Sequence, residues 1–261
     1  MNDATPFSFG TSHSELLRPE GICWDDVPRH PLPAEAIRTL QYMQDTESHT
    51  IIYLRDLLST RAVDDTTIAA FFACWFYEES LHGRSLARFL TASGHEPLLR
   101  RRSQFRLQQR VHKWGVTLGS QLWPNFVAVH MTWGAINELT TLTAYGRLAE
   151  LTDHPVLAEI LQRIQRDEAR HFRFYFETAE RCLAGSSAAR AVTGRIIGRF
   201  WEPVGSGVQP DAETRFVADY LFTGAEGRAA AQRIDRTMRR LPGLDGVDLL
   251  EAWIDRSVRP S

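Results

Sequence analysis

Two short segments of the chain each pair a glutamate with a histidine three residues later, Glu79 with His82 and Glu168 with His171. A further glutamate precedes each pair, Glu47 by thirty-two residues and Glu138 by thirty. Residues three apart lie on one face of a helix, so each pair can direct a carboxylate and an imidazole at one point. The repeated pattern indicates a site with four carboxylates and two imidazoles.

The ligand types narrow the chemistry of such a site. Carboxylate oxygens with only two imidazole nitrogens, and no cysteine, suit a redox-active iron pair better than structural zinc. Without metal, four carboxylates held together in a low dielectric would have to take up protons. One Glu-X-X-His on a helix is usually a solvated surface pair, but two pairs with matched leading glutamates favour metal binding. We therefore expect two iron ions per chain, with manganese as the chemical alternative.

Helical patterns surround all six candidate ligands. The first is expected over about 34–59, after Pro31 and Pro33, because proline is tolerated at a helix start. The second is expected from a cap at Asp64 or Asp65 to Ala92, before the Ser93-Gly94 stop signal. Two more are expected over about 124–151 and 156–183, and a shorter connecting helix over about 96–113. Long helices of this kind are typical of bundles.

The rest of the chain also reads as helical. After the break at Gly185, shorter helices are expected over about 188–201, 211–223, 226–240 and 246–257. No alternating strand pattern of useful length is present. We predict an all-α fold, a ferritin-like four-helix bundle with additional C-terminal helices. The expected organisation is an irregular segment over 1–30 and one helical domain over 31–261.

Composition limits the class of protein. The chain has 261 residues, 43% of them hydrophobic, and a net charge of −2, which are values of a globular protein. No apolar run is long enough for a bilayer and no secretory leader is evident, so we expect a cytoplasmic protein without membrane insertion. Cys23, Cys74 and Cys182 form no paired spacing. The slightly negative charge and the lack of a binding motif argue against nucleic acid.

Basic residues are concentrated in one stretch of fourteen, at four-residue spacings that make one helical face: Arg100, Arg101, Arg102, Arg106, Arg110 and Lys113. A run of charge is usually a solvated face. The alternative is a docking surface for an acidic partner, because complementary charge steers encounter.

The motifs resemble those of a known family. The stretches WFYEESLHGRSLARFL, from Trp75, and DEARHFRFY, from Asp167, resemble the Glu-Glu-X-X-His-Gly and Asp-Glu-X-Arg-His signatures of the soluble acyl-acyl carrier protein desaturases. Thr46-Glu47 followed by Tyr53 agrees with the family too. The resemblance covers most of the chain from about residue 24. It implies metal ligation by Glu47, Glu79, His82, Glu138, Glu168 and His171.

The same resemblance implies roles for four further residues. Asp167 would orient a ligand histidine, as metal-bound imidazoles usually require, or it is an ordinary helix-surface aspartate. Glu78 precedes its own motif in the same way and would serve the other histidine. Thr141, three residues after Glu138, would relay a proton to bound oxygen, or its hydroxyl bonds back to its own helix. Trp24 resembles a tryptophan on the family's electron route.

The implied activity is an oxidoreductase of fatty acid biosynthesis. It would use two irons, O2 and electrons from a ferredoxin-type donor to introduce a C=C bond into an acyl chain on acyl carrier protein. The basic face would dock the carrier, and a homodimer is expected. The chain is shorter than plant members and has Ile51 in place of the family's proline. These departures leave the acyl chain and the position of oxidation open.

Three alternatives share the metal site. One is a hydroxylase or other oxidase that acts on a carrier-bound or free biosynthetic intermediate, which the sequence hardly separates from a desaturase. Another is a ferritin-like iron-binding protein without an organic substrate, although ferritins are shorter single bundles. The last is a radical-generating subunit like that of ribonucleotide reductase. That family has a tyrosine four residues after the first-motif histidine, where this chain has Leu86.

Overall fold

The structure is a computed structural model that describes residues 14–17, 21–98, 123–207 and 209–257. Within these ranges the regular elements are helices, and no strand occurs. The all-α class expected from the sequence is confirmed. Nearly all of the expected 96–113 helix lies outside the described residues, and so does the whole predicted basic face: Arg100, Arg101, Arg102, Arg106, Arg110 and Lys113.

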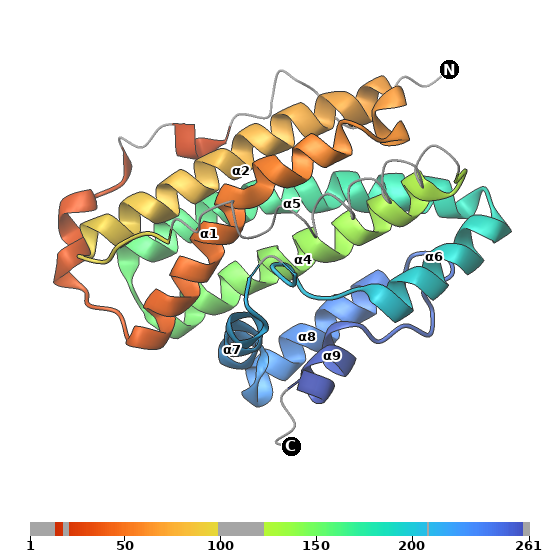
Figure 1. Cartoon of the computed structure of the whole chain (residues 1–261). Helices are drawn as coiled ribbons and strands as arrows, with labels where there is room; N and C mark the ends of the chain where they lie inside the picture. The colour runs from red at the N-terminus through yellow and green to blue at the C-terminus, as the bar shows by residue number, and fades with distance from the viewer. Residues whose placement is uncertain (1–13, 18–20, 99–122, 208, 258–261) are drawn as a thin grey trace.

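Four long helices form the bundle: α1 (Ala34–Leu57), α2 (Thr66–Ala92), α4 (Phe126–Thr152) and α5 (Pro155–Ala184). The most extensive packing joins α4 to α5 and α1 to α2. The two pairs lie against each other as layers, and short connections make each pair antiparallel (Figure 1). All four occur within about two residues of the predicted bounds.

Local signals account for where these helices begin and end. The Asp65 carboxylate accepts hydrogen bonds from the backbone N–H groups of Thr67 (2.8 Å) and Ile68 (3.2 Å), which caps α2. Asp153 follows α4 in the left-handed conformation with φ 43°. His154 then accepts from the Leu157 N–H at 3.2 Å to cap α5, with Pro155 at the first helical position.

The C-terminal third of the described chain forms α6 (Ser187–Phe200), α7 (Asp211–Phe222), α8 (Gly224–Met238) and α9 (Leu250–Ser257). Three of these, α6, α7 and α8, pack against α4 on the lower side of the bundle in Figure 1, and α7 also packs against α1. Because α4 is covered on both sides, its apolar residues are spread around its circumference and not along one stripe. Two short 3-10 helices, η1 (Glu15–Leu17) and η3 (Trp24–Arg29), precede the bundle.

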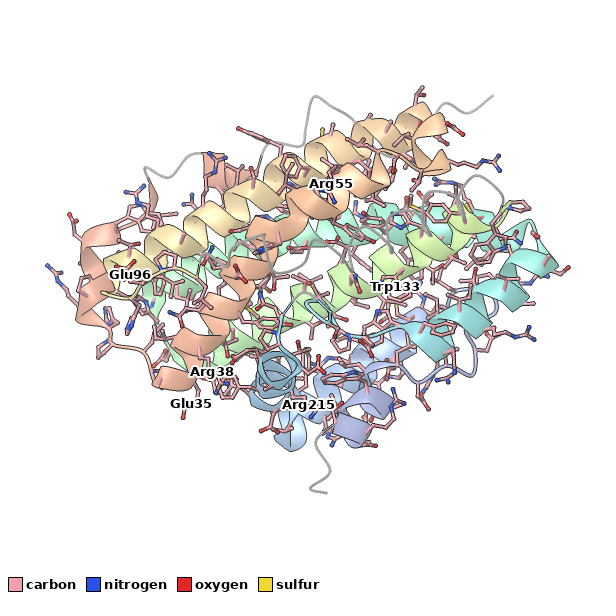
Figure 2. The ribbon with its side chains drawn as sticks, in the orientation of Figure 1. Glu35, Arg38, Arg55, Glu96, Trp133 and Arg215 are labelled. Carbon is pink, nitrogen blue, oxygen red and sulfur yellow. The ribbon has the colours of Figure 1, made fainter. Side chains whose placement is uncertain are left out.

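A polar contact ties the added helices to the bundle. The Arg38 guanidinium of α1 makes two hydrogen bonds to the Glu213 carboxylate of α7, at 2.9 and 3.0 Å. Its central carbon also lies 3.9 Å from the centre of the Phe216 ring. Figure 2 shows Arg38 near the start of α1, on the side where α7 lies. This cation-π and ion-pair arrangement fixes the position of α7 against the first helix.

Gly134 allows α4 and α5 to approach closely in the aromatic core. A Cβ atom at this position would collide with the ring of Tyr175 on α5. We expect Gly134→Ala to lower the free energy of unfolding by about 1–3 kcal/mol, the usual cost of overpacking. Gly146→Ala on the same helix is the control, because its Cβ would meet only the Gln165 side-chain oxygen at 3.4 Å. Urea unfolding followed by circular dichroism measures both, and equal effects would contradict the account.

Candidate metal centre

Each of the four bundle helices supplies part of one buried cluster. Glu47 comes from α1 and Glu138 from α4, while α2 and α5 each supply a glutamate and a histidine one turn apart. The six residues are at most 7% exposed. The structure therefore brings together all six residues that the repeated sequence pattern singled out: Glu47, Glu79, His82, Glu138, Glu168 and His171.

The cluster consists of two overlapping groups. The first contains Glu47, Glu79, His82 and Glu168, and the second contains Glu79, Glu138, Glu168 and His171, with the ligand atoms of each group within 4.8 Å of one another. Glu79 and Glu168 belong to both groups. Two shared carboxylates with one carboxylate and one imidazole at each end are the arrangement of a dinuclear site with bridging ligands.

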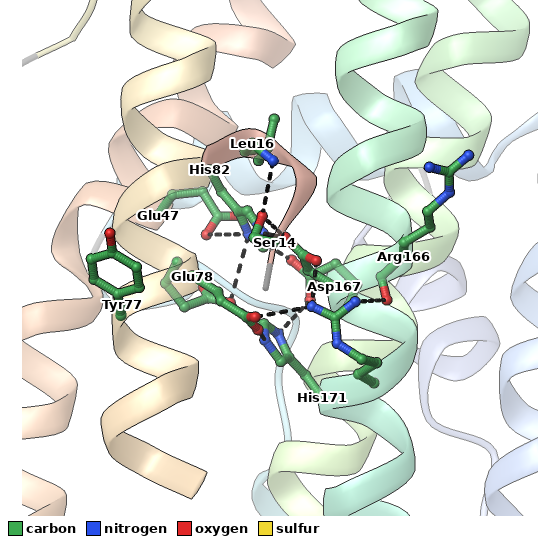
Figure 3. A network of polar contacts seen from close by, with 12 residues as sticks. Ser14, Leu16, Glu47, Tyr77, Glu78, His82, Arg166, Asp167 and His171 are labelled. Atoms are coloured by element: carbon green, nitrogen blue, oxygen red, sulfur yellow. Dashed lines mark hydrogen bonds and ion pairs between the residues drawn. The ribbon is translucent and has the colours of Figure 1, made fainter. Parts of the chain in front are cut away.

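Both imidazoles present the same ring nitrogen to the cluster. Nδ1 of His82 lies 3.3 Å from Glu168 Oε1 and 3.8 Å from Glu47 Oε2. Nδ1 of His171 lies 3.3 Å from Glu79 Oε1 and 3.5 Å from Glu138 Oε2. Figure 3 shows the two histidines on facing helices, with their rings directed into the space between them.

The outer nitrogen of each imidazole contacts an acidic residue that belongs to the other motif. Nε2 of His82, in the first motif, lies 3.2 Å from Oδ2 of Asp167, which precedes the second motif. Nε2 of His171 lies 2.7 Å from Oε2 of Glu78, which precedes the first. A carboxylate on the outer nitrogen fixes the tautomer and the orientation of a metal-binding imidazole.

Arg170 links these two outer carboxylates. Its Nη2 donates to Glu78 at 2.9 Å and to Asp167 at 2.5 Å. The Ser14 hydroxyl, from the segment before the bundle, also donates to Asp167. The histidines are therefore oriented by a continuous hydrogen-bonded layer that joins α2, α5 and the N-terminal segment.

Two buried aromatic side chains donate to the carboxylates at the ends of the cluster. The Tyr145 hydroxyl donates to Glu47 Oε1, and the Trp75 indole donates to Glu138 Oε1 at 3.1 Å. Sequence reasoning had assigned no role to either. The available signal for Tyr145 was its place seven residues after Glu138, two turns along the same face of α4.

Two other residues that were predicted from the sequence to serve the site are not members of the cluster. Thr141 is half-buried on α4, one turn beyond Glu138. The Trp24 ring lies beneath the Arg88 guanidinium, 4.1 Å from its centre, and its indole nitrogen has no hydrogen-bond partner among the described residues.

The donor set fits a pair of metal ions. Within the described part of the chain, the buried atoms that lack hydrogen-bond partners include Nδ1 of both histidines, Glu47 Oε2, Glu79 Oε1 and both Glu168 oxygens. Buried polar atoms without partners are costly and rare. The six atoms named here all belong to one cluster, in which two metal ions would satisfy them. The excess of oxygen over nitrogen donors suits iron or manganese.

Protons must balance the charge of the cluster when metal is absent. Burial, reinforced by the Glu47 and Glu168 carboxylates, raises the pKa of Glu79 well above its usual range. Burial and Glu168 also raise the pKa of Glu138 to about 8. Burial alone would lower the pKa of His82 and His171, but the surrounding carboxylates outweigh it and raise both. At neutral pH the metal-free cluster therefore holds several protons.

Metal binding is expected to release these protons. Glu138 keeps its proton up to about pH 8, so a metal ion must displace it at pH 6 and no longer at pH 9. The affinity for Co(II) should therefore rise with pH, roughly tenfold per pH unit for each proton displaced. Calorimetry in buffers of different ionisation enthalpy should show more than one proton released per chain. An affinity independent of pH would contradict this description of the cluster.

Comparison with known proteins adds a family assignment. Residues 46–195 match the family model described as "Fatty acid desaturase", a range that contains all six cluster residues. No curated protein matches the chain. Among the helices of the described residues, none combines the length and the apolar character needed to cross a membrane.

Proposed function

The chain belongs to the fatty acid desaturase family, and from this premise we propose a di-iron, O2-dependent desaturase that introduces a C=C bond into an acyl chain on acyl carrier protein. The observation that carries the proposal is the pair of buried ligand groups that share Glu79 and Glu168. Glu47 and His82 would complete one iron site, and Glu138 and His171 the other. The family implies an oxidoreductase, and a dinuclear site suits a reaction that removes two hydrogens.

When bound, the iron pair would supply the oxidising power of O2, with two electrons from a ferredoxin-type donor and two protons, so that each turnover yields the alkene and two waters. The protein's part is to keep the ligands rigid and the site dry. The Phe71 ring stacks on Phe174 at 3.9 Å and meets His171 edge-on at 6.2 Å. These rings exclude water from one side of the cluster.

Residues beside the cluster would move protons and electrons. Thr141 carries a hydroxyl one turn from Glu138, which suits a proton relay. Trp24 lies on η3, which packs against α2 and α5, the two helices that carry the histidines. It would serve as one step of an electron route to the metal pair.

The proposed partners rest on sequence charge and on the family resemblance. The basic face from Arg100 to Lys113 would dock the acidic carrier protein, because complementary charge steers encounter. This face lies outside the described residues. The ferredoxin-type donor, a homodimer and a cytoplasmic location belong to the same proposal.

One observation favours a second candidate, hydroxylation of a more polar intermediate at the same metal pair. His130 is 7% exposed on α4 and lies among aromatic rings, with the Phe126 and Phe72 ring centres each 5.8 Å away. Burial lowers the pKa of His130 to about 4, so the imidazole is neutral, and its Nε2 has no partner among the described residues. A substrate that reached this imidazole could satisfy Nε2 through a hydroxyl or carbonyl, which a purely hydrocarbon chain could not do.

Intact mass spectrometry distinguishes the two candidates. The iron-loaded protein is incubated with acylated carrier proteins, O2 and a ferredoxin reducing system, and the mass of the acyl group is then compared with a control without O2. Loss of two hydrogens would support the desaturase, and gain of one oxygen would support the hydroxylase. If no acylated carrier reacts while the iron pair consumes O2, the carrier-protein part of the proposal is wrong.

A further inference from the structure

The Asp167 carboxylate, which contacts the outer nitrogen of His82, has one hydrogen-bond donor from outside the four-helix bundle. Its Oδ1 accepts from Arg170 Nη2 at 2.5 Å, and its Oδ2 lies 3.2 Å from His82 Nε2. The Ser14 hydroxyl, directly before η1, also donates to Oδ2 (Figure 3). Arg170 and Ser14 therefore hold one oxygen each, and the oxygen that Ser14 holds is the one that meets the imidazole.

The corresponding carboxylate at the other end of the cluster is held differently. Glu78 accepts from Arg170 through Oε1 at 2.9 Å and contacts His171 Nε2 through Oε2 at 2.7 Å. Among the described residues, Oε2 has no second hydrogen-bond donor. The outer contact of His171 is thus made by α2 and α5 alone, whereas that of His82 also depends on the residues before the bundle.

Residues 14–17, called the N-terminal segment below, are docked on α2 and α5 by contacts of their own. The Leu16 side chain is part of the hydrophobic core. Its backbone N–H donates to Ser14 Oγ at 3.2 Å, which fixes the hydroxyl oxygen while its proton is directed at Asp167. The backbone oxygen of Glu15 accepts from Arg163 Nη1 at 3.1 Å. The position of the Ser14 hydroxyl therefore depends on the segment remaining docked.

We propose that Ser14 is a positioning residue for His82 that acts through Asp167, and that docking of the N-terminal segment and metal binding at the His82 end stabilise each other. If the segment is displaced, Asp167 Oδ2 loses the donor that fixes it. An imidazole whose outer partner is no longer fixed binds metal less tightly. Linkage requires the converse, so a metal ion on His82 stabilises the docked segment by the same factor. The inference rests on the metal site proposed above.

Co(II) titration in two single-site backgrounds tests the positioning role. Glu138→Ala keeps the ligand group that contains His82, and Glu47→Ala keeps the group that contains His171. In the first background, Ser14→Ala should lower the affinity for the remaining ion about tenfold, the lower end of the effect of losing an outer partner. In the second background it should change the affinity little, because Ser14 makes no contact with Glu78.

Two further variants of the N-terminal segment separate docking from the hydrogen bond. Leu16→Ala keeps the Ser14 hydroxyl but removes the buried side chain that anchors the segment, so it should weaken the same ion as Ser14→Ala does. Glu15→Ala is the matched control. Its carboxylate pairs with Arg166 at the surface, where both side chains are about half exposed and such a pair contributes little. Glu15→Ala should therefore leave the affinity unchanged in both backgrounds.

Hydrogen exchange of the full-length chain gives a readout that does not depend on affinity. In the Glu138→Ala background, Co(II) should slow exchange of the Leu16 amide about tenfold, because linkage acts in both directions. In the Glu47→Ala background Co(II) should change it little. Circular dichroism shows whether each variant remains folded.

The outcomes separate this inference from the proposed function. If Ser14→Ala leaves the affinity unchanged in the Glu138→Ala background, or lowers it equally in both, the positioning role is wrong while the metal site stands. If Co(II) does not slow exchange at Leu16, the coupling to docking is wrong. If the unaltered protein binds fewer than two ions, the proposed metal pair is wrong and the inference fails with it.

Discussion

Replacing Glu168 with alanine should remove both metal ions and reduce activity to background. Glu168 belongs to both ligand groups, and neither of its oxygens has a hydrogen-bond partner among the described residues. Glu47→Ala removes a ligand from only one group and leaves Glu79, Glu138, Glu168 and His171 in place. This variant should keep one ion per chain, although it too should be inactive.

Metal content after dialysis and titration with Co(II) under nitrogen measure both variants. Glu180→Ala, on the exposed face of the same helix, is the control and should retain two ions. Circular dichroism shows whether α5 remains folded. Retention of two ions by Glu168→Ala would contradict the assignment of this residue as a bridging ligand.

Asp167→Asn should weaken metal binding at the His82 end of the cluster, although the residue belongs to the other sequence motif. The carboxylate lies 3.2 Å from His82 Nε2 and is 1% exposed. Loss of such an outer partner typically costs about 10- to 100-fold in metal affinity or activity. Glu78→Gln should act in the same way at the His171 end, where the contact is 2.7 Å.

The crossed arrangement can be tested in the Glu47→Ala background, where one metal ion remains beside His171. In that background Glu78→Gln should weaken binding of the remaining ion, and Asp167→Asn should change it little. Co(II) titration of the single and double variants measures both. The reverse order of effects would mean that each acidic residue serves the histidine of its own motif.

The long helices could be predicted because their signals are local. The Asp65 cap, the Ser93-Gly94 stop and the prolines before the first helix depend on neighbouring residues, and the structure confirms the helices they bound. The prediction of where α9 starts was less accurate, since the helix begins at Leu250 and not near residue 246. The reason is a contact between helices, because Asp235 of α8 accepts the backbone N–H groups of Leu250 and Glu251 at 3.1 Å.

The site shows the same division between local and distant information. The six cluster residues could be selected from helical spacing and ligand chemistry, because both depend only on residue types and their distances along the sequence. The identity of the histidine that each acidic residue contacts depends on how α2 faces α5. The bond from Ser14 to Asp167 spans 153 positions of the chain, and that from Tyr145 to Glu47 spans 98. Contacts at such separations follow from packing and have no local signal.

Mössbauer spectroscopy of protein loaded with 57Fe(II) under nitrogen, and then exposed to O2, tests the dinuclear site most directly. We predict two irons per chain, with oxidation giving a coupled diferric pair that has no net spin at low temperature. Quantitative metal analysis of the same sample supplies the count. A single iron per chain, or two irons that oxidise to separate high-spin ferric ions, would contradict the account.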